Sequence, residues 1–579
     1  TGVGNYCTLN PISRFGQSSS TSITLTNGNL TSAAGDTNNK SVMGTMSIPP
    51  SGKWYFEARV DAVGGSPGSH GMGIRKVWSY QSAGVGADSN ARVYIGDGDK
   101  GNGSTTTHGS AWAAGNIIGV AVDMDNGALY FAINNTWQAS SDPTSGSSKT
   151  NAAYTDLVST GFLWAPVHEP GNGTLTFNFG ADGFTYTPPT DYKALATHNL
   201  PETTVTKPSD FFQVIQYTGN EGTRVVKDGA SLGAGAISLS FAPDFVWLKS
   251  TSEEYWHGVH DVLRGATKTL YTNRTDADAT GELTHIGTNG DGSNGFTVTT
   301  TGVARFNEHD SGGSGEDYVG FCLKAGGSGS ANTDGATSDA DATGYDSTVS
   351  VASHSGFSIV KWTSIGTTSS GARVGHGMGK KPEFIIIKST TDGSDGWHVW
   401  HKDLSGTGKY LKLNTTNGEA DDSGNAWDGH ANTNTTTFSV GDGGGSNWTN
   451  DDSETYMAYC FARTPGFIGI GKYTGNNSTN GTNVIIDDGA SGFKPAWVMI
   501  KRNEDGYAWH IHNSGMASYN AVGYHLNAND AGVTSSTSRM DFTSNGFKLR
   551  TTNGGYNASA TYLYLAFAET PFGLNNRAR

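Results

Sequence analysis

Residues 243–249 (PDFVWLK) place a proline before a mainly apolar run that ends in lysine. Aromatic and β-branched residues dominate this run, which is typical of a short β-strand. The same pattern occurs twice more, at residues 382–388 (PEFIIIK) and 495–501 (PAWVMIK). The sequence therefore predicts three related segments, each containing one such strand.

The sequence around each copy follows a common order. An alternating strand with an aromatic end precedes the run; a Trp-His pair, a Phe-centred strand and an aromatic closing strand follow it. In chain order the opening strands are residues 213–217, 357–362 and 470–473, the pairs are Trp256-His257, Trp397-His398 and Trp509-His510, the central phenylalanines are Phe296, Phe438 and Phe547, and the closing strands are residues 318–324, 456–462 and 562–568. This pattern predicts a tandem array of β-modules, which suits the presentation of surface rather than one enclosed catalytic pocket.

The composition supports an all-β chain of several domains. Glycine accounts for 82 of the 579 residues, about twice its average share of roughly 7 per cent. Short β-branched and aromatic runs are frequent, and a stretch of a dozen residues with clean helical periodicity is absent from the sequence. A chain of this length exceeds what a single hydrophobic core usually organises. We therefore predict an all-β, multi-domain fold.

Charge and hydropathy exclude some classes of partner. The chain has 37 basic and 52 acidic residues, a net charge of −15, which disfavours binding to nucleic acid. No apolar run approaches the roughly 20 residues that a membrane span needs. The chain starts at Thr1 without a methionine, and we expect a further segment upstream of it.

Three cysteines do not make a disulfide framework. Cys322 and Cys460 occupy the same place in their closing strands, and Ala566 stands there in the third copy. A redox pair would not be replaced by alanine, so we interpret these cysteines as small buried core residues.

Residues 1–200 lack the repeated pattern and carry other signals. Strands are predicted at residues 53–60, 117–123, 128–133, 164–167 and 174–179, and Asp125-Asn126-Gly127 predicts a hairpin turn between two of them. Their order and spacing, together with WYFE at 54–57 and NFG at 178–180, resemble the SPRY domain over residues 20–190. The resemblance implies a concanavalin-like β-sandwich that binds ligands through edge loops and performs no chemistry. The family's Asn-Gly turn is Asn134-Asn135 in this chain.

The chain combines the N-terminal block NYCTLNP (5–11), the SPRY-like region, the three copies and the closing TPFG (570–573) with its short basic tail. In this combination, which spans nearly the whole chain, the sequence resembles tail-fibre-like virion proteins of marine bacteriophages. The resemblance implies a component of the virion, located on the tail or the particle surface. It also implies a homo-oligomer, and the expected oligomer is a trimer.

Two linkers divide the predicted domains. Residues 201–208 (PETTVTKP) contain two prolines that favour extended chain, and residues 328–356 are rich in Gly, Ser and Asp. We expect the second linker to be flexible or loosely docked. The predicted domains are 1–200 (SPRY-like sandwich), 201–327, 357–466 and 467–579 (three β-repeat domains), with 328–356 as the linker.

The repeated residues have structural and functional interpretations. We favour core packing for the Trp-His pairs, because burying tryptophan contributes roughly 4–6 kcal/mol gross; stacking on sugar rings is the alternative. For the repeated lysines, Lys249, Lys388 and Lys501, we expect solvated or snorkelling side chains, with ligand contact as the alternative.

The best ligand-binding candidates are large aromatic residues in polar loops of the SPRY-like region. They are Trp78, Tyr80, Trp112 and Trp137, and domain or subunit packing would explain them equally well. Acidic groups occur at Asp334, Asp339 and Asp341 and at Asp451, Asp452 and Glu454. Neither group has the spacing of an EF-hand. We predict no metal site and no cofactor, and leave open whether loop carboxylates bind Ca²⁺.

The sequence therefore predicts a non-enzymatic virion structural protein: a tail fibre or similar appendage that binds host surface glycan during adsorption. Its partners would be other tail or capsid proteins and the glycan, without nucleic acid or membrane insertion. One alternative is a passive capsid-surface or tail adaptor or decoration protein. A less favoured one is a polysaccharide depolymerase using paired carboxylates; the sequence shows no motif of established catalytic spacing.

Overall fold

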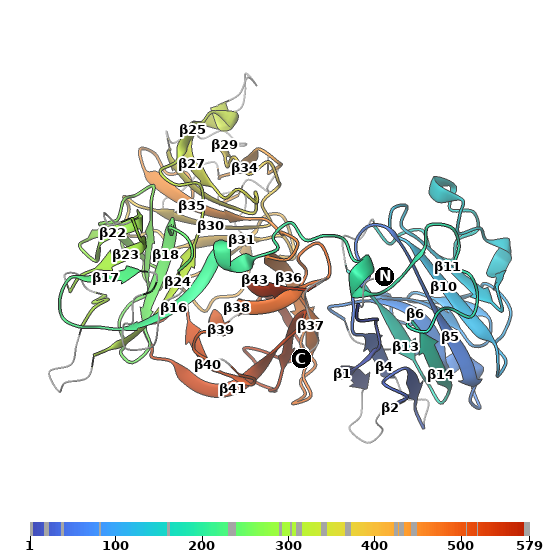
Figure 1. Cartoon of the computed structure of the whole chain (residues 1–579). Coiled ribbons are helices and arrows are strands. Elements are labelled where there is room, and N and C mark those ends of the chain that lie inside the picture. Colours follow the sequence, from blue (N-terminus) through green and yellow to red (C-terminus); the bar gives the residue numbers. More distant parts are fainter. Residues whose placement is uncertain are drawn as a thin grey trace.

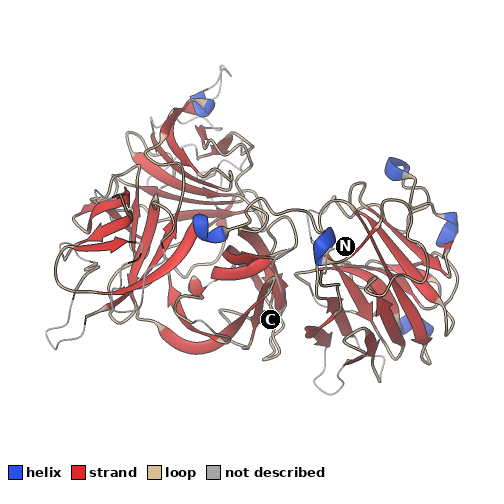
Figure 2. Cartoon of the chain, viewed as in Figure 1, coloured by secondary structure: helices blue, strands red, loops and turns tan. Residues whose placement is uncertain are grey.

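The computed structural model describes residues 4–16, 23–35, 40–79, 83–158, 163–227, 229, 239–288, 292–300, 304–308, 315–336, 344–364, 372–421, 426–427, 433–441, 448–504, 506–517 and 519–572. An N-terminal domain and a three-lobed C-terminal part lie side by side (Figure 1). Strands dominate both parts (Figure 2), which confirms the all-β, multi-domain prediction.

The helices of the described residues are short 3₁₀ turns of three residues each: η1 (Pro67–Ser69), η2 (Gln138–Ser140), η3 (Gly146–Ser148), η4 (Thr197–Asn199), η5 (Pro208–Asp210) and η6 (Asp334–Ala336). Within the described ranges, therefore, no helix has the length or apolar character needed to cross a membrane.

The N-terminal domain is a sandwich of two antiparallel sheets. The first contains, in spatial order, β1 (Leu9–Gly16), β4 (Lys40–Gly44), β13 (Trp164–Glu169), β6 (Gly71–Lys76), β7 (Ala91–Ile95), β8 (Asp99–Gly101) and β9 (Thr105–Thr107). The second contains β12 (Thr136–Trp137), β11 (Ala128–Ile133), β10 (Ile117–Asp123), β5 (Lys53–Ala62), β14 (Thr174–Asn178), β3 (Thr31–Ala33) and β2 (Thr24–Thr26), with β15 (Lys193–Ala194) parallel to β5. Alternate residues of the central strands, such as Phe56, Val120 and Phe131, fill one core between the sheets.

Local turn chemistry sets the hairpins of this domain. The Asp125-Asn126-Gly127 turn joins β10 to β11, and Gly127 has a φ of 72°. Asn134 and Asn135 connect β11 to β12 with φ values of 47° and 63°. Asparagine tolerates the left-handed region better than most residues, so the pair makes this turn without glycine.

The C-terminal part contains three units, each with a large sheet. In the first unit (residues 212–323) the order is β16 (Phe212–Thr218), β24 (Asp317–Leu323), β18 (Phe245–Ser250), β19 (Gly258–Asp261), β20 (Lys268–Tyr271) and β21 (Ala279–Thr280). In the second (330–461) it is β25 (Ser330–Asn332), β27 (Ser347–Val351), β28 (Phe357–Thr363), β35 (Thr455–Phe461), β30 (Phe384–Ser389), β31 (His398–His401), β32 (Lys409–Lys412) and β33 (Ala420–Asp421). In the third (468–571) it is β36 (Ile468–Thr474), β43 (Thr561–Pro571), β38 (Phe493–Arg502), β39 (His510–Asn513), β40 (Val522–Asn527), β41 (Ser535–Thr543), β42 (Gly546–Leu549) and β37 (Asn483–Ile485).

A smaller sheet covers the large sheet in the first two units. The first unit has β17 (Arg224–Lys227), β23 (Asn294–Val298) and β22 (Leu283–Thr288), and the second has β26 (Gly344–Tyr345), β29 (Arg373–Gly375) and β34 (Thr437–Ser439). In the third unit β41, β42 and β37 continue the large sheet instead.

In each unit a stacked aromatic pair joins the opening strand (β16, β28 or β36) to the closing strand (β24, β35 or β43). Tyr217 faces Tyr318 at 5.0 Å between ring centroids, Trp362 faces Tyr456 at 5.3 Å, and Tyr473 faces Tyr562 at 4.9 Å. Aromatic cross-strand pairs of this kind help to fix the register of a sheet.

The three large sheets face one another around a common core. Alternation along β18 sends Phe245 and Trp247 into this shared core, whereas Val246 and Leu248 pack within the first unit. Phe384 and Ile386 of β30, and Trp497 and Met499 of β38, enter the same cluster. Both faces of these strands are therefore buried, and one face of each unit belongs to a core that all three share.

The second predicted linker is not a loosely docked segment. Its described residues form β25, η6, β26 and β27, and β27 pairs with β28 along residues 347–351. Val349 is buried, and Ser350 Oγ accepts a hydrogen bond from Gly326 N (2.9 Å). Its Ser/Gly/Asp composition concealed a short alternating strand, TVSV, which extends the sheet of the second unit. Asp339 and Asp341 lie outside the described residues.

Candidate functional site

Trp112 is a core residue. Only 5% of it is exposed, and its ring meets the edges of His70 and Tyr94 at 5.1 and 5.7 Å. The prediction of a loop aromatic open to ligand is wrong here, because the loop before β10 folds inward and uses the indole to close one end of the sandwich.

Of the next two candidates, Trp137 and Tyr80, only Trp137 lies among the described residues. Trp137 lies in the short β12, is half-buried, and packs against a cluster that includes Tyr55, Tyr130 and Tyr192. Trp137 is therefore only partly covered by this cluster. Tyr80 lies outside the described residues.

Trp78 lies at the contact between the N-terminal domain and the third unit. Its carbonyl accepts a hydrogen bond from Thr474 N (3.4 Å), and the ammonium groups of Lys76 and Lys472 lie 5.8 and 5.6 Å from its ring. The indole is half-buried and packs against the shared core cluster. Of the four predicted ligand-binding residues, this one joins two domains.

Further contacts fix the same junction. Asn545 Nδ2 donates to Thr45 O (3.0 Å), and Lys548 Nζ donates to Ile12 O (2.9 Å). A hollow of about 10 Å³ beside Trp78 is bordered by Asp487, which also accepts hydrogen bonds from Arg463 Nη1 at 2.7 and 2.8 Å. The hollow is too small for an organic ligand, so the junction is an interface inside the chain.

We expect Trp78→Ala to weaken this junction. The change removes the ring from two ammonium groups, and each such contact contributes roughly 0.5–1 kcal/mol. Hydrogen–deuterium exchange should therefore accelerate in the junction peptides, including the amide of Thr474. Trp137→Ala, which removes a half-buried indole in the same domain, is the matched control; equal acceleration at Thr474 in both variants would contradict the junction role.

The Trp-His pairs are used in packing between units. Trp397 and Trp509 are 1% and 2% exposed. Trp397 Nε1 donates to Tyr271 O of the first unit (2.9 Å), and Trp509 Nε1 donates to Lys412 O of the second unit (3.0 Å). The core-packing interpretation is confirmed for both. Trp256 is half-buried instead, with the Arg274 guanidinium 4.0 Å from its ring.

The repeated lysines are buried, so the prediction of solvated side chains is wrong. Lys249, Lys388 and Lys501 are at most 1% exposed. Each ammonium donates to two backbone carbonyls in the loop that follows its strand: Lys249 to Ser250 O (2.6 Å) and Glu253 O (3.0 Å), Lys388 to Ser389 O (2.7 Å) and Asp392 O (3.1 Å), and Lys501 to Arg502 O (2.5 Å) and Glu504 O (3.3 Å). Burial lowers the pKa of Lys249 and of Lys388 to about 8. The lysines therefore shape the loops before the Trp-His pairs.

Cys322 and Cys460 are buried free thiols, as predicted, and Cys7 is a third one. Burial raises the pKa of Cys7 to about 11 and raises the pKa values of Cys322 and Cys460 further still. Because the thiolate is the reactive form, these residues are chemically inert in the folded chain.

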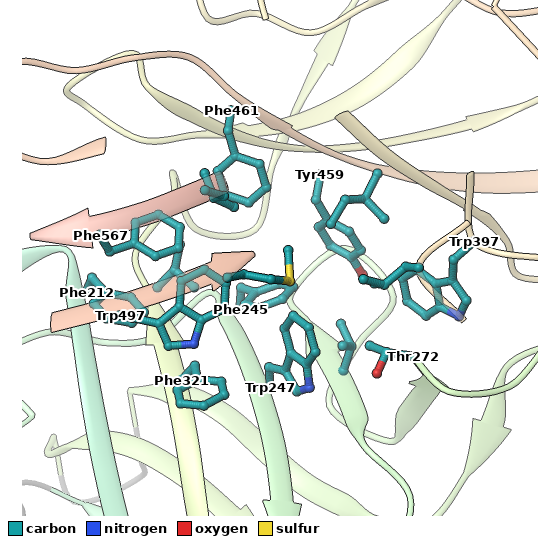
Figure 3. A pocket seen from close by; sticks show the side chains of 16 residues that line it. Phe212, Phe245, Trp247, Thr272, Phe321, Trp397, Tyr459, Phe461, Trp497 and Phe567 are labelled. Atoms are coloured by element: carbon teal, nitrogen blue, oxygen red, sulfur yellow. The ribbon is translucent and has the colours of Figure 1, made fainter. Parts of the chain in front are cut away.

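A cavity of about 30 Å³ lies in the shared core (Figure 3). Aromatic side chains of all three units point into it, among them Trp247, Trp397, Tyr459, Trp497 and Phe567. Its lining is almost entirely apolar, and an apolar cavity of this kind stays dry. The cavity is a packing gap rather than a binding site.

One group of carboxylates has the arrangement of a cation site. Oxygen atoms of Asp392, Asp395 and Glu454 lie within 4.8 Å of one another. Burial, followed by the charges of Glu454 and Asp451, raises the pKa of Asp395 to about 8. Sequence inspection identified Glu454 and its neighbour Asp451 but missed Asp392 and Asp395, which are about 60 residues away along the chain and meet Glu454 only through the pairing of β30 with β35.

Comparison with known proteins gives the class of the N-terminal domain. The SPRY domain family matches residues 53–181, and this part of the chain is a SPRY domain with a β-sandwich fold. Similar solved structures are the SPRY domain of human HERC1 (15% identity, 29% of this chain and 96% of that chain, TM-score 0.23), stonustoxin (18%, 30% and 27%, 0.21) and the PSpry domain of TRIM65 (16%, 30% and 92%, 0.22).

The C-terminal part defines the family. Residues 207–571, more than half of the chain, match the family described as "Domain of unknown function (DUF7483)". The chain belongs to this family.

Proposed function

We propose that this chain is a structural protein of a bacteriophage particle, a tail fibre or similar appendage, that binds host surface glycan without catalysing a reaction. The resemblance of the whole sequence to tail-fibre-like virion proteins supports the location. Homotrimeric assembly and contacts with other tail or capsid proteins are part of the same proposal.

The shared core is the observation that carries the proposal. Three units with matching stacked pairs, buried lysines and central strands surround one aromatic cluster, which supports the inference that they are copies of one module. The SPRY domain is fixed to the third unit by hydrogen bonds and by Trp78. Such a body holds its outer loops in constant relative positions, as a presenting appendage requires.

Weak sites are sufficient for such a role. A single glycan contact with a Kd near 1 mM corresponds to about −4 kcal/mol. Several copies on one particle can increase avidity by roughly 10² to 10⁴ without new contacts. The half-buried Trp137 of the SPRY domain is a candidate contact, since the residue is not fully covered by its neighbours.

The test is adsorption to host cells. Purified chain should bind the host of its particle and compete with particle adsorption, and an antibody against it should label the tail or surface of intact particles by electron microscopy. Labelling without competition would support a passive adaptor or decoration protein instead. New reducing ends after incubation with host polysaccharide would indicate a depolymerase, and absence from the particle would overturn the proposal.

A further inference from the structure

The loop between β30 and β31 and the residues before β35 bring three carboxylates together in the second unit. Ser389 at the end of β30 pairs with Tyr456 near the start of β35, so the two segments emerge side by side from the sheet. Asp392 and Asp395 come from the first segment and Glu454 from the second. Their oxygen atoms lie within 4.8 Å of one another, a separation at which one cation can contact all three.

Asp395 is buried, with an exposed fraction of 0%. Among the residues that the structure describes, neither Oδ1 nor Oδ2 of Asp395 has a hydrogen-bond partner, and neither does the buried Oε2 of Glu454. A buried carboxylate that lacks donors is costly unless a proton or a cation neutralises it.

The lysine beside the cluster does not satisfy these oxygens. Lys388 Nζ donates to the carbonyl oxygens of Ser389 and Asp392 at 2.7 and 3.1 Å, and so it is turned toward the backbone of the loop. Its single positive charge cannot neutralise the negative charge of three carboxylates. Hydrogen bonds within the loop fix its conformation: Ser389 Oγ accepts a hydrogen bond from Asp392 N (2.9 Å), and Asp392 Oδ1 accepts hydrogen bonds from Ser394 N and Oγ, both at 2.7 Å.

We propose that Asp392, Asp395 and Glu454 form a Ca²⁺ site. All candidate ligands are carboxylate oxygens, which hard cations prefer, and they sit on loops that tolerate the irregular geometry of calcium. Water completes the roughly six to eight oxygens that Ca²⁺ takes. The ion joins the β30–β31 loop to the segment before β35 and gives the Asp395 carboxylate a positive partner in direct contact, which the ammonium of Lys388, turned toward the loop backbone, does not provide.

The corresponding positions of the other two units do not form this group. In the first unit Glu316 corresponds to Glu454 and accepts a hydrogen bond from Ser252 Oγ (2.6 Å), while Glu254, two residues before the Trp-His pair like Asp395, is exposed. In the third unit the same two positions are Ala560 and Tyr507. The site therefore belongs to the second unit.

Calorimetric titration of the full chain with CaCl₂ after chelator treatment tests the site, together with thermal unfolding at matched Ca²⁺ concentrations. Wild-type chain should bind Ca²⁺ and unfold at a higher temperature in its presence. Asp395→Asn and Glu454→Gln should each weaken Ca²⁺ binding by at least about tenfold. Asp452→Asn removes an exposed carboxylate from the same segment and should bind as the wild type does.

Asp395→Asn removes a buried carboxyl group that is costly to ionise, so it should fold at least as well as the wild type in the absence of Ca²⁺. If the Asp395→Asn variant does not fold, Ca²⁺ binding is compared between the wild type and the Glu454→Gln variant. Absence of both heat and thermal shift in the wild type, or unchanged Ca²⁺ binding in the Asp395→Asn or Glu454→Gln variant, overturns the site. An equal or larger effect of MgCl₂ overturns the assignment to calcium, because Mg²⁺ demands nearly ideal octahedral geometry.

Discussion

Replacing Trp497 with alanine is expected to lower the free energy of unfolding of the C-terminal part by about 3–5 kcal/mol. The side chain is 2% exposed and lies at the centre of the shared core. Its ring meets Phe321 and Trp247 of the first unit at 5.8 and 6.5 Å, and Phe567 of the third at 5.4 Å. The substitution would enlarge the neighbouring cavity between the units. The three sheets around the cavity cannot all move inward to fill the space that the indole leaves.

Urea denaturation followed by circular dichroism measures this effect. Tyr519→Ala, at a side chain that is 85% exposed, is the control and should change the free energy by no more than about 0.5 kcal/mol. Because the core is shared, Trp497→Ala should shift the unfolding of all three units. A variant in which only one of several separate transitions moves would contradict a common core.

Local features of the fold were predictable from the sequence. The predicted strands at residues 117–123 and 128–133 coincide with β10 and β11, and the Asp125-Asn126-Gly127 turn lies between them. The aromatic ends of the opening strands, such as Tyr217, face the first tyrosine of the closing strands. Periodicity and turn residues act over a few positions, so they can be read without knowing the neighbours in space.

The arrangement of the units was not predictable in this way. A strand such as β30, apolar on both faces, is compatible with a core on either side, and its sequence does not reveal that one side is shared with two other units. The same reason explains the lysines: Lys388 ends an apolar run and looks like a strand end at the surface, yet a loop folds over it and offers two carbonyl oxygens. The acidic group depends on sheet pairing between distant segments.

Lowering the pH from 7.5 to 5 is expected to reduce the stability of the chain steeply. Burial lowers the pKa of His260, His398 and His510 to about 3 and that of His401 to about 4. An unfolded histidine titrates near 6.5. These residues therefore stabilise the fold fully above pH 6.5, and each loses about 1.4 kcal/mol per pH unit below it, until the pH reaches the folded pKa.

Buried carboxyl groups with a raised pKa act in the opposite direction, among them Asp395, Asp488, Glu169 and Asp244. Burial raises the pKa of Asp395 to about 8 and that of Asp488 to about 6, so both retain protons that the unfolded chain releases. Histidines with a lowered pKa outnumber them, since His168, His257 and His512 join the four above. The net effect is proton uptake on unfolding, and stability must fall as the pH decreases.

Denaturant titrations at pH 7.5, 6.5, 5.5 and 5 give the slope of stability against pH. His401→Gln serves as the matched variant, because it removes one titrating group whose Nδ1 accepts from Asp403 N (3.0 Å). Between pH 6.5 and 5 this variant should take up about one proton fewer than the wild type on unfolding, so its stability should depend less on pH. If the wild type is equally stable at pH 7.5 and 5, these imidazoles are charged or hydrated in the folded chain. That result would contradict the burial of these histidines.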